Sequence, residues 1–457
     1  MKKEYLKPLI RKLQSGLMNK YGKSPLYSRQ VKSELDGVPV AELVERFGSP
    51  LFVYSERTLR KRYRQAYTAF STRYPNVAFG WSYKTNFLQS ICAVMHREGA
   101  LAEVVSRMEV EMARALGVRG ENIIFNGPHK PLDTLVTVLG EGGMVNVDHL
   151  DEIADVEKAA EQLGRPVKVG LRLNLDAGIY PQWTRFGFNL ESGQALEAVK
   201  RLSRSRRVTL AGLHCHLGTF ILDPRAYSRQ VEKMVQFAKE LQQSFGFEME
   251  YLDIGGGFPS RIQLKGTYLA PDVAVPPIDE YAEQITDALW RTLEPASFPK
   301  LIIESGRALV DEAASLITTI RAAKRLADGT RAYVADAGVN LLFTSFWYKF
   351  GIALDRPVSG PSEPCIINGP LCMNIDCLED QALLPPLSRG TRLIFSPVGA
   401  YNNTQWLQFI EYRPNVVLIG EGGEVDVIRE AENLDYVRLQ ERLPARLTGP
   451  VAPAGKH

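Results

Sequence analysis

Residues 79–86 read Phe79-Gly80-Trp81-Ser82-Tyr83-Lys84-Thr85-Asn86, which predicts a buried strand that ends on a lysine. In an α/β protein, a lysine at the C-terminal end of such a strand points into the mouth where the loops gather. Burial there lowers the pKa of the amine and makes it a nucleophile for Schiff-base chemistry. A surface lysine just past a strand is the alternative. Residues elsewhere in the chain are needed to distinguish a catalytic lysine from a surface one.

The same strand-like pattern recurs along the next two hundred or so residues, and most of the intervals between the runs have a helical pattern. The predicted strands cover 77–84, 102–106, 122–127, 144–148, 169–174, 212–218, 250–257 and 301–307. The predicted helices cover 87–98, 107–117, 131–139, 149–163, 193–205, 225–245 and 278–293. Near-continuous apolar strands of this kind predict an α/β fold, a (β/α)8 barrel. A doubly wound open sheet is the alternative, but no dinucleotide-type glycine fingerprint follows the first strand.

Alternating β-type runs replace the helical pattern after about residue 308, at 315–321, 332–335, 364–368, 392–396 and 416–419. This change predicts a second, mostly β domain at 309–442, after a barrel at 51–308. We expect residues 1–50 to form an N-terminal helix and a segment that joins the β domain. The Pro-, Ala- and Gly-rich residues 443–457 predict a disordered tail.

Composition sets broad limits on function. The 457 residues are 45% hydrophobic and 23% charged, which is typical of a globular protein with two domains. A net charge of +3 gives no argument for binding nucleic acid or membranes.

The N-terminal 25 residues lack the apolar core of a signal peptide, but their leucines recur at helical spacing opposite a basic face. We expect this helix to pack on the body or at a subunit contact, with a membrane-surface or partner helix as the alternative. The five cysteines follow no zinc-ligand pattern and predict a reducing cytoplasm and no metal: Cys92, Cys215, Cys365, Cys372 and Cys377.

Polar residues gather at the predicted strand ends, where a barrel places its chemistry. They are Lys84, Ser106, Asp148, Arg172, Asn174, His214, His216, Glu304, Ser305 and Arg307, with Glu103 inside the second predicted strand and the glycines Gly255, Gly256, Gly257 and Gly306 beside them. The three consecutive glycines allow a close backbone approach to an anion, although a tight turn would also use them. Glu304 could keep a ring nitrogen protonated or form a salt bridge, and His216 could stack on a ring or simply be hydrogen-bonded. A lysine, an anion cradle, a carboxylate and a flat ring together fit pyridoxal phosphate.

Six motifs in order carry a family resemblance: SYKTN (82–86), LHCHLG (213–218), LDIGGGFP (252–259), ESGR (304–307), GPLC (369–372) followed by Asp376, and GAY (399–401). The chain resembles the fold-type III pyridoxal-phosphate decarboxylases and is most similar to the diaminopimelate decarboxylases, over roughly residues 45–420. The resemblance implies an alanine-racemase-like barrel with a β domain, an amino-acid decarboxylase, and a homodimer with active sites at the subunit interface.

The resemblance also implies roles for individual residues. Lys84 would bind the cofactor covalently, His216 would stack on its ring, and Glu304 would pair with its pyridine nitrogen. Its phosphate would lie near Thr219, Gly255, Gly256, Gly257, Gly306, Arg307 and Tyr401. Cys372 would reach in from the partner subunit and return a proton to the substrate carbon, whereas a buried cysteine without a role is the alternative. Substrate contacts would come from Arg307, Tyr348, Met373, Asn374 and Asp376.

Two positions depart from the diaminopimelate decarboxylases. Met373 stands where those enzymes have a glutamate, and Thr344 stands where they have an arginine that grips the distal carboxylate. Losing a charged, bidentate grip weakens binding in a desolvated site. The hypothesis is therefore decarboxylation of another amino acid in secondary metabolism, such as a diamino acid, an acidic amino acid, or one conjugated to another molecule or a carrier protein. Diaminopimelate decarboxylase itself, a racemase of the same fold and a non-catalytic homologue are the alternatives.

Overall fold

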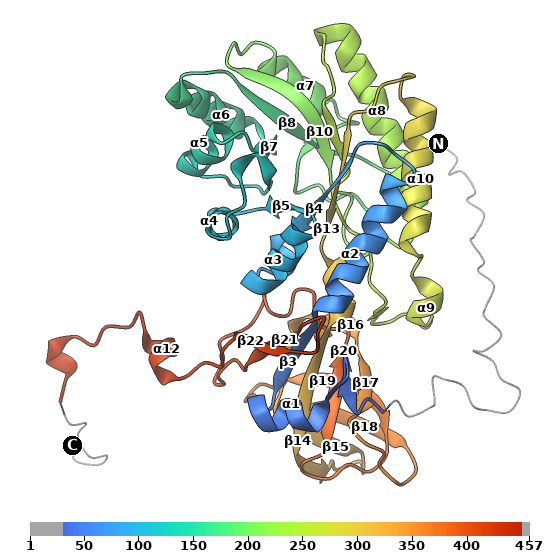
Figure 1. The fold of residues 1–457 in the computed structure, drawn as a ribbon, viewed down its shortest axis with the longest axis vertical. Coiled ribbons are helices and arrows are strands. Elements are labelled where there is room, and N and C mark those ends of the chain that lie inside the picture. The colour runs from blue at the N-terminus through green and yellow to red at the C-terminus, as the bar shows by residue number, and fades with distance from the viewer. Residues whose placement is uncertain (1–30, 450–457) are drawn as a thin grey trace, which may run out of the picture.

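The computed structural model describes residues 31–449, so the predicted N-terminal helix and residues 450–457 lie outside the described residues. The described chain forms a barrel surrounded by helices and, at one end of it, a β domain (Figure 1). Among the described helices, none combines the length and apolar composition that a membrane span requires.

The barrel is closed by eight parallel strands. They are β4 (Val77–Ser82), β5 (Leu101–Val104), β6 (Ile123–Phe125), β7 (Met144–Val147), β8 (Val167–Asn174), β10 (Val208–Cys215), β11 (Tyr251–Asp253) and β13 (Lys300–Ser305). Closure is complete because β13 pairs with β4 and β10 pairs with β8. The short strand β9 (Phe188–Asn189) pairs in parallel with the C-terminal end of β8. The predicted (β/α)8 barrel is confirmed, and the open-sheet alternative is excluded.

Helices surround this barrel on its outside (Figure 1). They are α2 (Glu56–Ser71), α3 (Gln89–Arg97), α4 (Arg107–Ala115), α5 (Leu132–Gly140), α6 (Leu150–Leu163), α7 (Gln194–Leu202), α8 (Arg225–Phe245) and α10 (Ile278–Thr292). Local sequence sets several of their ends. The Ser106 side chain accepts a hydrogen bond from the Glu109 N–H and caps α4, and Gly246 ends α8 in the left-handed conformation. The short helices are α1 (Val40–Phe47), α9 (Pro271–Ala274), α11 (Arg307–Val310) and α12 (Leu434–Arg438).

The β domain is organised around the long strand β14 (Ala314–Arg325), which pairs with β15 (Arg331–Ala335), β20 (Arg392–Ser396) and β3 (Leu51–Ser55). Its outer strands are β17 (Gly351–Leu354), β18 (Glu363–Asn368), β19 (Cys377–Leu384), β21 (Val416–Ile419) and β22 (Val425–Arg429). Two small ribbons complete the list, β1 (Glu34–Leu35) with β2 (Val38–Pro39) and β12 (Gln263–Leu264) with β16 (Tyr348–Lys349).

The position of β3 corrects the predicted domain boundary. This buried strand lies between β14 and β21, so it belongs to the β sheet, and the barrel begins after it, at α2, rather than at residue 51. The correction has a physical reason, because an apolar run shows that a strand is buried but does not show which sheet it joins.

The two domains meet directly behind Lys84. The buried Asn86 amide donates hydrogen bonds to the Tyr54 hydroxyl, at 2.8 Å, and to the Gly399 carbonyl oxygen, at 3.0 Å. The Tyr54 hydroxyl in turn donates to the Asn403 side-chain oxygen. These groups are buried, so each depends on the others for its hydrogen bonds.

Replacing Tyr54 with phenylalanine tests this junction. The Y54F variant removes one of the two hydrogen bonds of the buried Asn86 amide and leaves the Asn403 side-chain oxygen without its Tyr54 donor, so we expect unfolding to become easier by about 1–3 kcal/mol. The midpoint of denaturant unfolding measures this change. Tyr268→Phe is the matched control because Tyr268 is fully exposed. Equal midpoints for the two variants would contradict a stabilising role for the junction.

Candidate active site

A cavity of about 510 Å³ opens where the C-terminal ends of the barrel strands face the β domain. Residues of both domains line it. The predicted site residues that it brings together are Lys84, His216, Thr219, Gly256, Gly257, Glu304, Gly306, Arg307, Tyr348 and Tyr401. Residues that are far apart in the chain therefore converge on one space, as the strand-end argument predicted.

Lys84 lies in the short 3-10 turn Tyr83–Thr85 that follows β4, and its side chain remains about one-third exposed. Its Nζ atom lies 2.6 Å from a carboxylate oxygen of Glu103, which is buried on the neighbouring strand β5. Burial alone would lower the pKa of Lys84, but the Glu103 and Glu304 carboxylates raise it above the ordinary lysine value. The expectation of a lowered pKa is therefore wrong for the free amine, because a strand-borne carboxylate stabilises its charged form.

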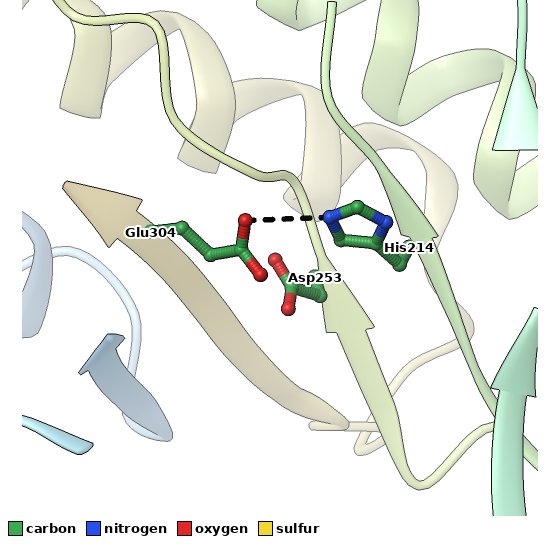
Figure 2. A group of neighbouring side chains, drawn as sticks. All are labelled: His214, Asp253 and Glu304. Atoms are coloured by element: carbon green, nitrogen blue, oxygen red, sulfur yellow. Dashed lines mark hydrogen bonds and ion pairs between the residues drawn. The ribbon is translucent and has the colours of Figure 1, made fainter. Parts of the chain in front are cut away.

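Glu304, His214 and Asp253 converge from the ends of β13, β10 and β11 (Figure 2). The Glu304 carboxylate lies 3.4 Å from His214 Nε2 and accepts a hydrogen bond from the Asn126 amide. Burial works against its charge, but His214 and Lys84 hold the pKa of Glu304 well below the usual range. Burial and the nearby Glu304 charge raise the pKa of Asp253. Glu304 is therefore the member of the group that keeps its negative charge.

His216 presents an uncharged ring to the cavity. Burial, with the charges of Lys84 and Arg172, lowers the pKa of His216 to about 3. Its Nδ1 atom accepts a hydrogen bond of 3.0 Å from the Gly256 N–H, which leaves the proton of the neutral ring on Nε2. The indole of Trp183 lies edge-on to this ring, with 5.5 Å between centroids. A neutral, oriented ring of this kind can stack on a flat cofactor.

Glycine is required where the backbone lines the cavity. A Cβ atom on Gly256 would collide with the Glu304 carbonyl oxygen, and one on Gly306 would collide with the Thr85 hydroxyl. Gly256 therefore packs against the backbone of β13 and Gly306 against the Thr85 side chain, and the two glycines present no side chain of their own to the cavity that they line. Such a surface suits a phosphate, which can approach the peptide N–H groups closely.

Arg307 completes this anion site. Its guanidinium lies between the rings of Tyr348 and Tyr401, 4.4 and 5.0 Å from their centroids. One nitrogen lies 3.4 Å from an Asp311 oxygen, but the buried Nε has no hydrogen-bond partner among the described residues. An unpaired buried guanidinium N–H is costly unless an anionic group binds it. A phosphate or a carboxylate in the cavity would satisfy it.

These groups fit pyridoxal phosphate. Lys84 offers the amine, Glu304 the carboxylate for the pyridine nitrogen, and His216 the flat neutral ring, while the glycine surface and Arg307 suit the phosphate. A barrel with this site defines the class of enzymes that use pyridoxal phosphate to transform amino acids.

Comparison with known proteins gives the family. Residues 57–311 match the family described as pyridoxal-dependent decarboxylase, pyridoxal binding domain. The chain therefore belongs to the pyridoxal-dependent decarboxylases, and it is a pyridoxal-phosphate-dependent amino-acid decarboxylase. This assignment favours decarboxylation over the racemase and non-catalytic alternatives.

The relatives match almost the whole chain. It is 31% identical to diaminopimelate decarboxylase of Actinosynnema pretiosum over 91% of this chain and 94% of that protein. It is 28% identical to that of Methanothermobacter thermautotrophicus, over 90% and 96% of the two chains. The crystal structure of diaminopimelate decarboxylase from Methanocaldococcus jannaschii superposes with a TM-score of 0.83 at 27% identity, covering 92% of this chain and 99% of that one.

Several predicted residues lie outside the cavity. Cys372, Met373 and Asn374 are on the loop between β18 and β19, where Cys372 and Asn374 are exposed. Asp376 is buried on the same loop, and its two oxygens accept the N–H groups of Val339 and Leu371, each at 2.7 Å. In this position, Asp376 holds the shape of the loop that carries Cys372. Gly255 lies behind the cavity surface, where its N–H donates to Asp253.

Other contacts of the site were not predicted from the sequence. Asn126 joins Glu103, Lys84 and Glu304 in one polar network, and the sequence places Glu103 inside the second predicted strand without assigning it a partner. Large apolar residues outside the periodic segments of the sequence also line the cavity, and they include Trp183, Phe220, Leu264 and Trp347.

The Glu103→Gln variant tests the control of the Lys84 amine. Removing the charge 2.6 Å away should lower the pKa of Lys84, so more of the amine is neutral and reactive near pH 7. Each pKa unit increases that neutral fraction about tenfold. We expect the apoenzyme to take up pyridoxal phosphate faster than the wild type at pH 7, with the advantage shrinking as the pH rises. Absorbance of the lysine-bound cofactor measures the rate.

Two variants serve as controls for this measurement. Glu109→Gln removes a buried carboxylate that bonds the Val105 N–H instead of Lys84, so its effect on the rate should be smaller. Lys84→Ala should show no lysine-bound band at all. If the Glu103→Gln variant took up cofactor no faster than the wild type, the assigned role of Glu103 would be wrong.

Proposed function

We propose that this enzyme removes the α-carboxylate of an amino acid whose distal end is not the charged amino-acid head of diaminopimelate. The observation that carries the proposal is the distribution of charge in the cavity. Among its described lining residues, the charged ones are Lys84, Glu304 and Arg307, and all three lie on the cofactor side. The distal side offers no charged partner for a second ammonium or carboxylate.

Thr344 supports this proposal. It stands where the resemblance implies an arginine, and it is buried in the 3-10 turn Phe343–Phe346. Its hydroxyl and its N–H both donate to the Asn402 side-chain oxygen, at 2.9 and 3.2 Å. The hydroxyl proton is thus already used within the protein and is not available to a substrate carboxylate.

Side chains of this protein account for the chemistry on the cofactor side of the cavity. Bound pyridoxal phosphate supplies an electron sink for the bond that breaks. Lys84 holds the cofactor, the Glu304 charge favours a protonated ring nitrogen, and His216 keeps the ring in place. Arg307 binds an anionic group of the cofactor or the substrate. We assign the return of a proton to the substrate carbon to Cys372.

Cys372 needs a second subunit to act in this way, because it lies outside the cavity of its own chain. We therefore propose a homodimer in which the Cys372 loop of each subunit completes the other's site, as the family resemblance implies. Met373 and Asn374 on that loop would then face the substrate, and neither adds a charge. A cytoplasmic location stays a prediction from the cysteine pattern.

Diaminopimelate decarboxylation in lysine biosynthesis is the second candidate. The relatives favour it, because the matches at 27–31% identity carry that name and cover nearly the whole chain. The crystal structure of one of them holds L-lysine. The difference between the two candidates lies in the distal end of the substrate.

Carbon dioxide release from meso-diaminopimelate separates the two candidates. We expect kcat/KM at least about tenfold below that of a dedicated diaminopimelate decarboxylase assayed in parallel, because a lost charged hydrogen bond is worth about 1.5–3 kcal/mol. Turnover equal to the dedicated enzyme would favour the second candidate. The Methanocaldococcus jannaschii enzyme is a suitable reference, since the two folds superpose closely.

The Cys372→Ala variant tests the proton donor. We expect cofactor absorbance to stay unchanged and turnover to fall about a hundredfold or more, because a positioned general acid contributes about 10²–10⁴ in rate. Cys377→Ala is the matched control, as Cys377 lies on the adjoining strand and should leave the rate nearly unchanged. Full activity of Cys372→Ala would show that another group delivers the proton.

A further inference from the structure

The distal side of the cavity is built mainly from large apolar side chains. Trp183, Phe220, Leu264 and Trp347 line it, with Gln405 as a polar neighbour. In the single chain the two indoles are 40% and 51% exposed, and their exposed surface faces the side of the cavity that we propose the Cys372 loop of the partner subunit completes.

A side chain at the end of a barrel strand holds the Trp183 loop in place. The Asn174 amide, at the end of β8, donates hydrogen bonds to the carbonyl oxygens of Trp183 and Phe186. The Trp183 indole lies edge-on against the His216 ring. This loop therefore presents an indole beside the cofactor ring position, and the anchor is a buried side chain of the barrel.

Trp347 belongs to the β domain, and a hydrogen bond from the barrel domain helps to hold it in place. Its carbonyl oxygen accepts a hydrogen bond of 2.9 Å from the Lys265 N–H, and its indole packs edge-on against Phe343. The next residue, Tyr348, begins the strand β16 that pairs with β12, where Leu264 lies. Trp347 and Leu264 are thus fixed parts of one wall that both domains build, and Trp183 lines the same cavity beside His216.

A second cavity, of about 270 Å³, lies on the other side of this wall. It shares Phe220 and Leu264 with the active site, and its remaining lining includes Leu222, Ile262 and Val275. The two shared side chains therefore separate the catalytic cavity from an apolar space at its distal end.

We propose that the enzyme acts on amino acids whose side chain ends in an uncharged acyl or aromatic group, such as a side-chain-acylated diamino acid. This inference rests on the proposed function and names its substrate class. Burying apolar surface favours such a group, and an indole face suits a flat one. A charged end would lose water without gaining an oppositely charged partner among the described lining residues.

The reaction is otherwise that of the family. The bond between the α-carbon and its carboxylate breaks, carbon dioxide leaves, and one proton returns to the α-carbon. The distal amide is unchanged, so the product is a monoacylated diamine. The wall selects the substrate and takes no part in bond breaking.

Indoles also attract cations, so an aromatic cage for a distal ammonium has to be distinguished from an acyl site. The holoenzyme is therefore assayed for carbon dioxide release with N6-benzoyl-L-lysine, N6-acetyl-L-lysine, L-lysine and N6-trimethyl-L-lysine. We expect kcat/KM for the benzoyl substrate to exceed that for lysine at least tenfold, with the acetyl substrate between them. A preference for lysine or the trimethylated lysine would overturn the inference while leaving decarboxylation intact.

Binding provides a measurement that does not depend on turnover. Calorimetry with the product amines N-benzoylcadaverine and cadaverine should show at least tenfold tighter binding of the benzoyl compound. If no lysine derivative released carbon dioxide, the proposed function would fail for this series, but the binding preference would still decide the inference. Equal binding of the two amines would overturn it.

Two variants locate the selectivity in the wall. Trp347→Ala should reduce the ratio of benzoyl-lysine to lysine kcat/KM at least fivefold, whereas Trp290→Ala, at an exposed tryptophan on α10, should not change it. Leu264→Ala should shift the preference toward longer acyl chains, because it opens the wall toward the second cavity. Unchanged ratios in both wall variants would overturn the assignment.

Discussion

The hydrogen bonds that follow Lys84 join the catalytic lysine to the second domain. The Asn86 amide donates to Tyr54 and Gly399, and the Thr85 carbonyl oxygen accepts the N–H of Tyr401. Tyr401 adopts a left-handed backbone conformation at this contact, with φ of 64°. A change in the junction would therefore move the amine and one of the rings that hold Arg307 at the same time.

The site is divided electrostatically. On the cofactor side, Lys84 lies among the buried carboxylates Glu103 and Glu304, and loss of the lysine would leave their buried charges uncompensated. Arg307 lies between two tyrosine rings with one N–H still unpaired. The distal side carries no comparable charges among the described residues, so its selectivity depends on shape, apolar area and neutral hydrogen bonds.

The sequence predicted the cofactor side better than the distal side, for physical reasons. Lys84, Glu304 and His216 stand at or just beyond strand ends, and strands have a repeating pattern that places their ends on one face of the barrel. Trp183 and Trp347 are on loops, where no period predicts which side chain faces inward. The pKa of Lys84 was predicted in the wrong direction because Glu103, on the next strand β5, was not recognised as the partner of its amine. Similarly, β3 was assigned to the barrel because pairing partners are not visible in an apolar run.

The division of the site into a charged cofactor side and an uncharged distal side also determines which residues can change independently. Removing Glu304, Arg307 or Glu103 would leave a buried charge or a buried polar group unpaired, and the consequence would reach the cofactor and the barrel strands. Replacing Trp347, Leu264 or Gln405 removes contact area at half-buried or exposed positions, and it leaves no charge uncompensated. The same barrel can therefore retain its cofactor chemistry while its distal wall takes different side chains. In this protein, the neutral Thr344–Asn402 pair and the two anchored indoles give that wall a chemistry suited to an uncharged group.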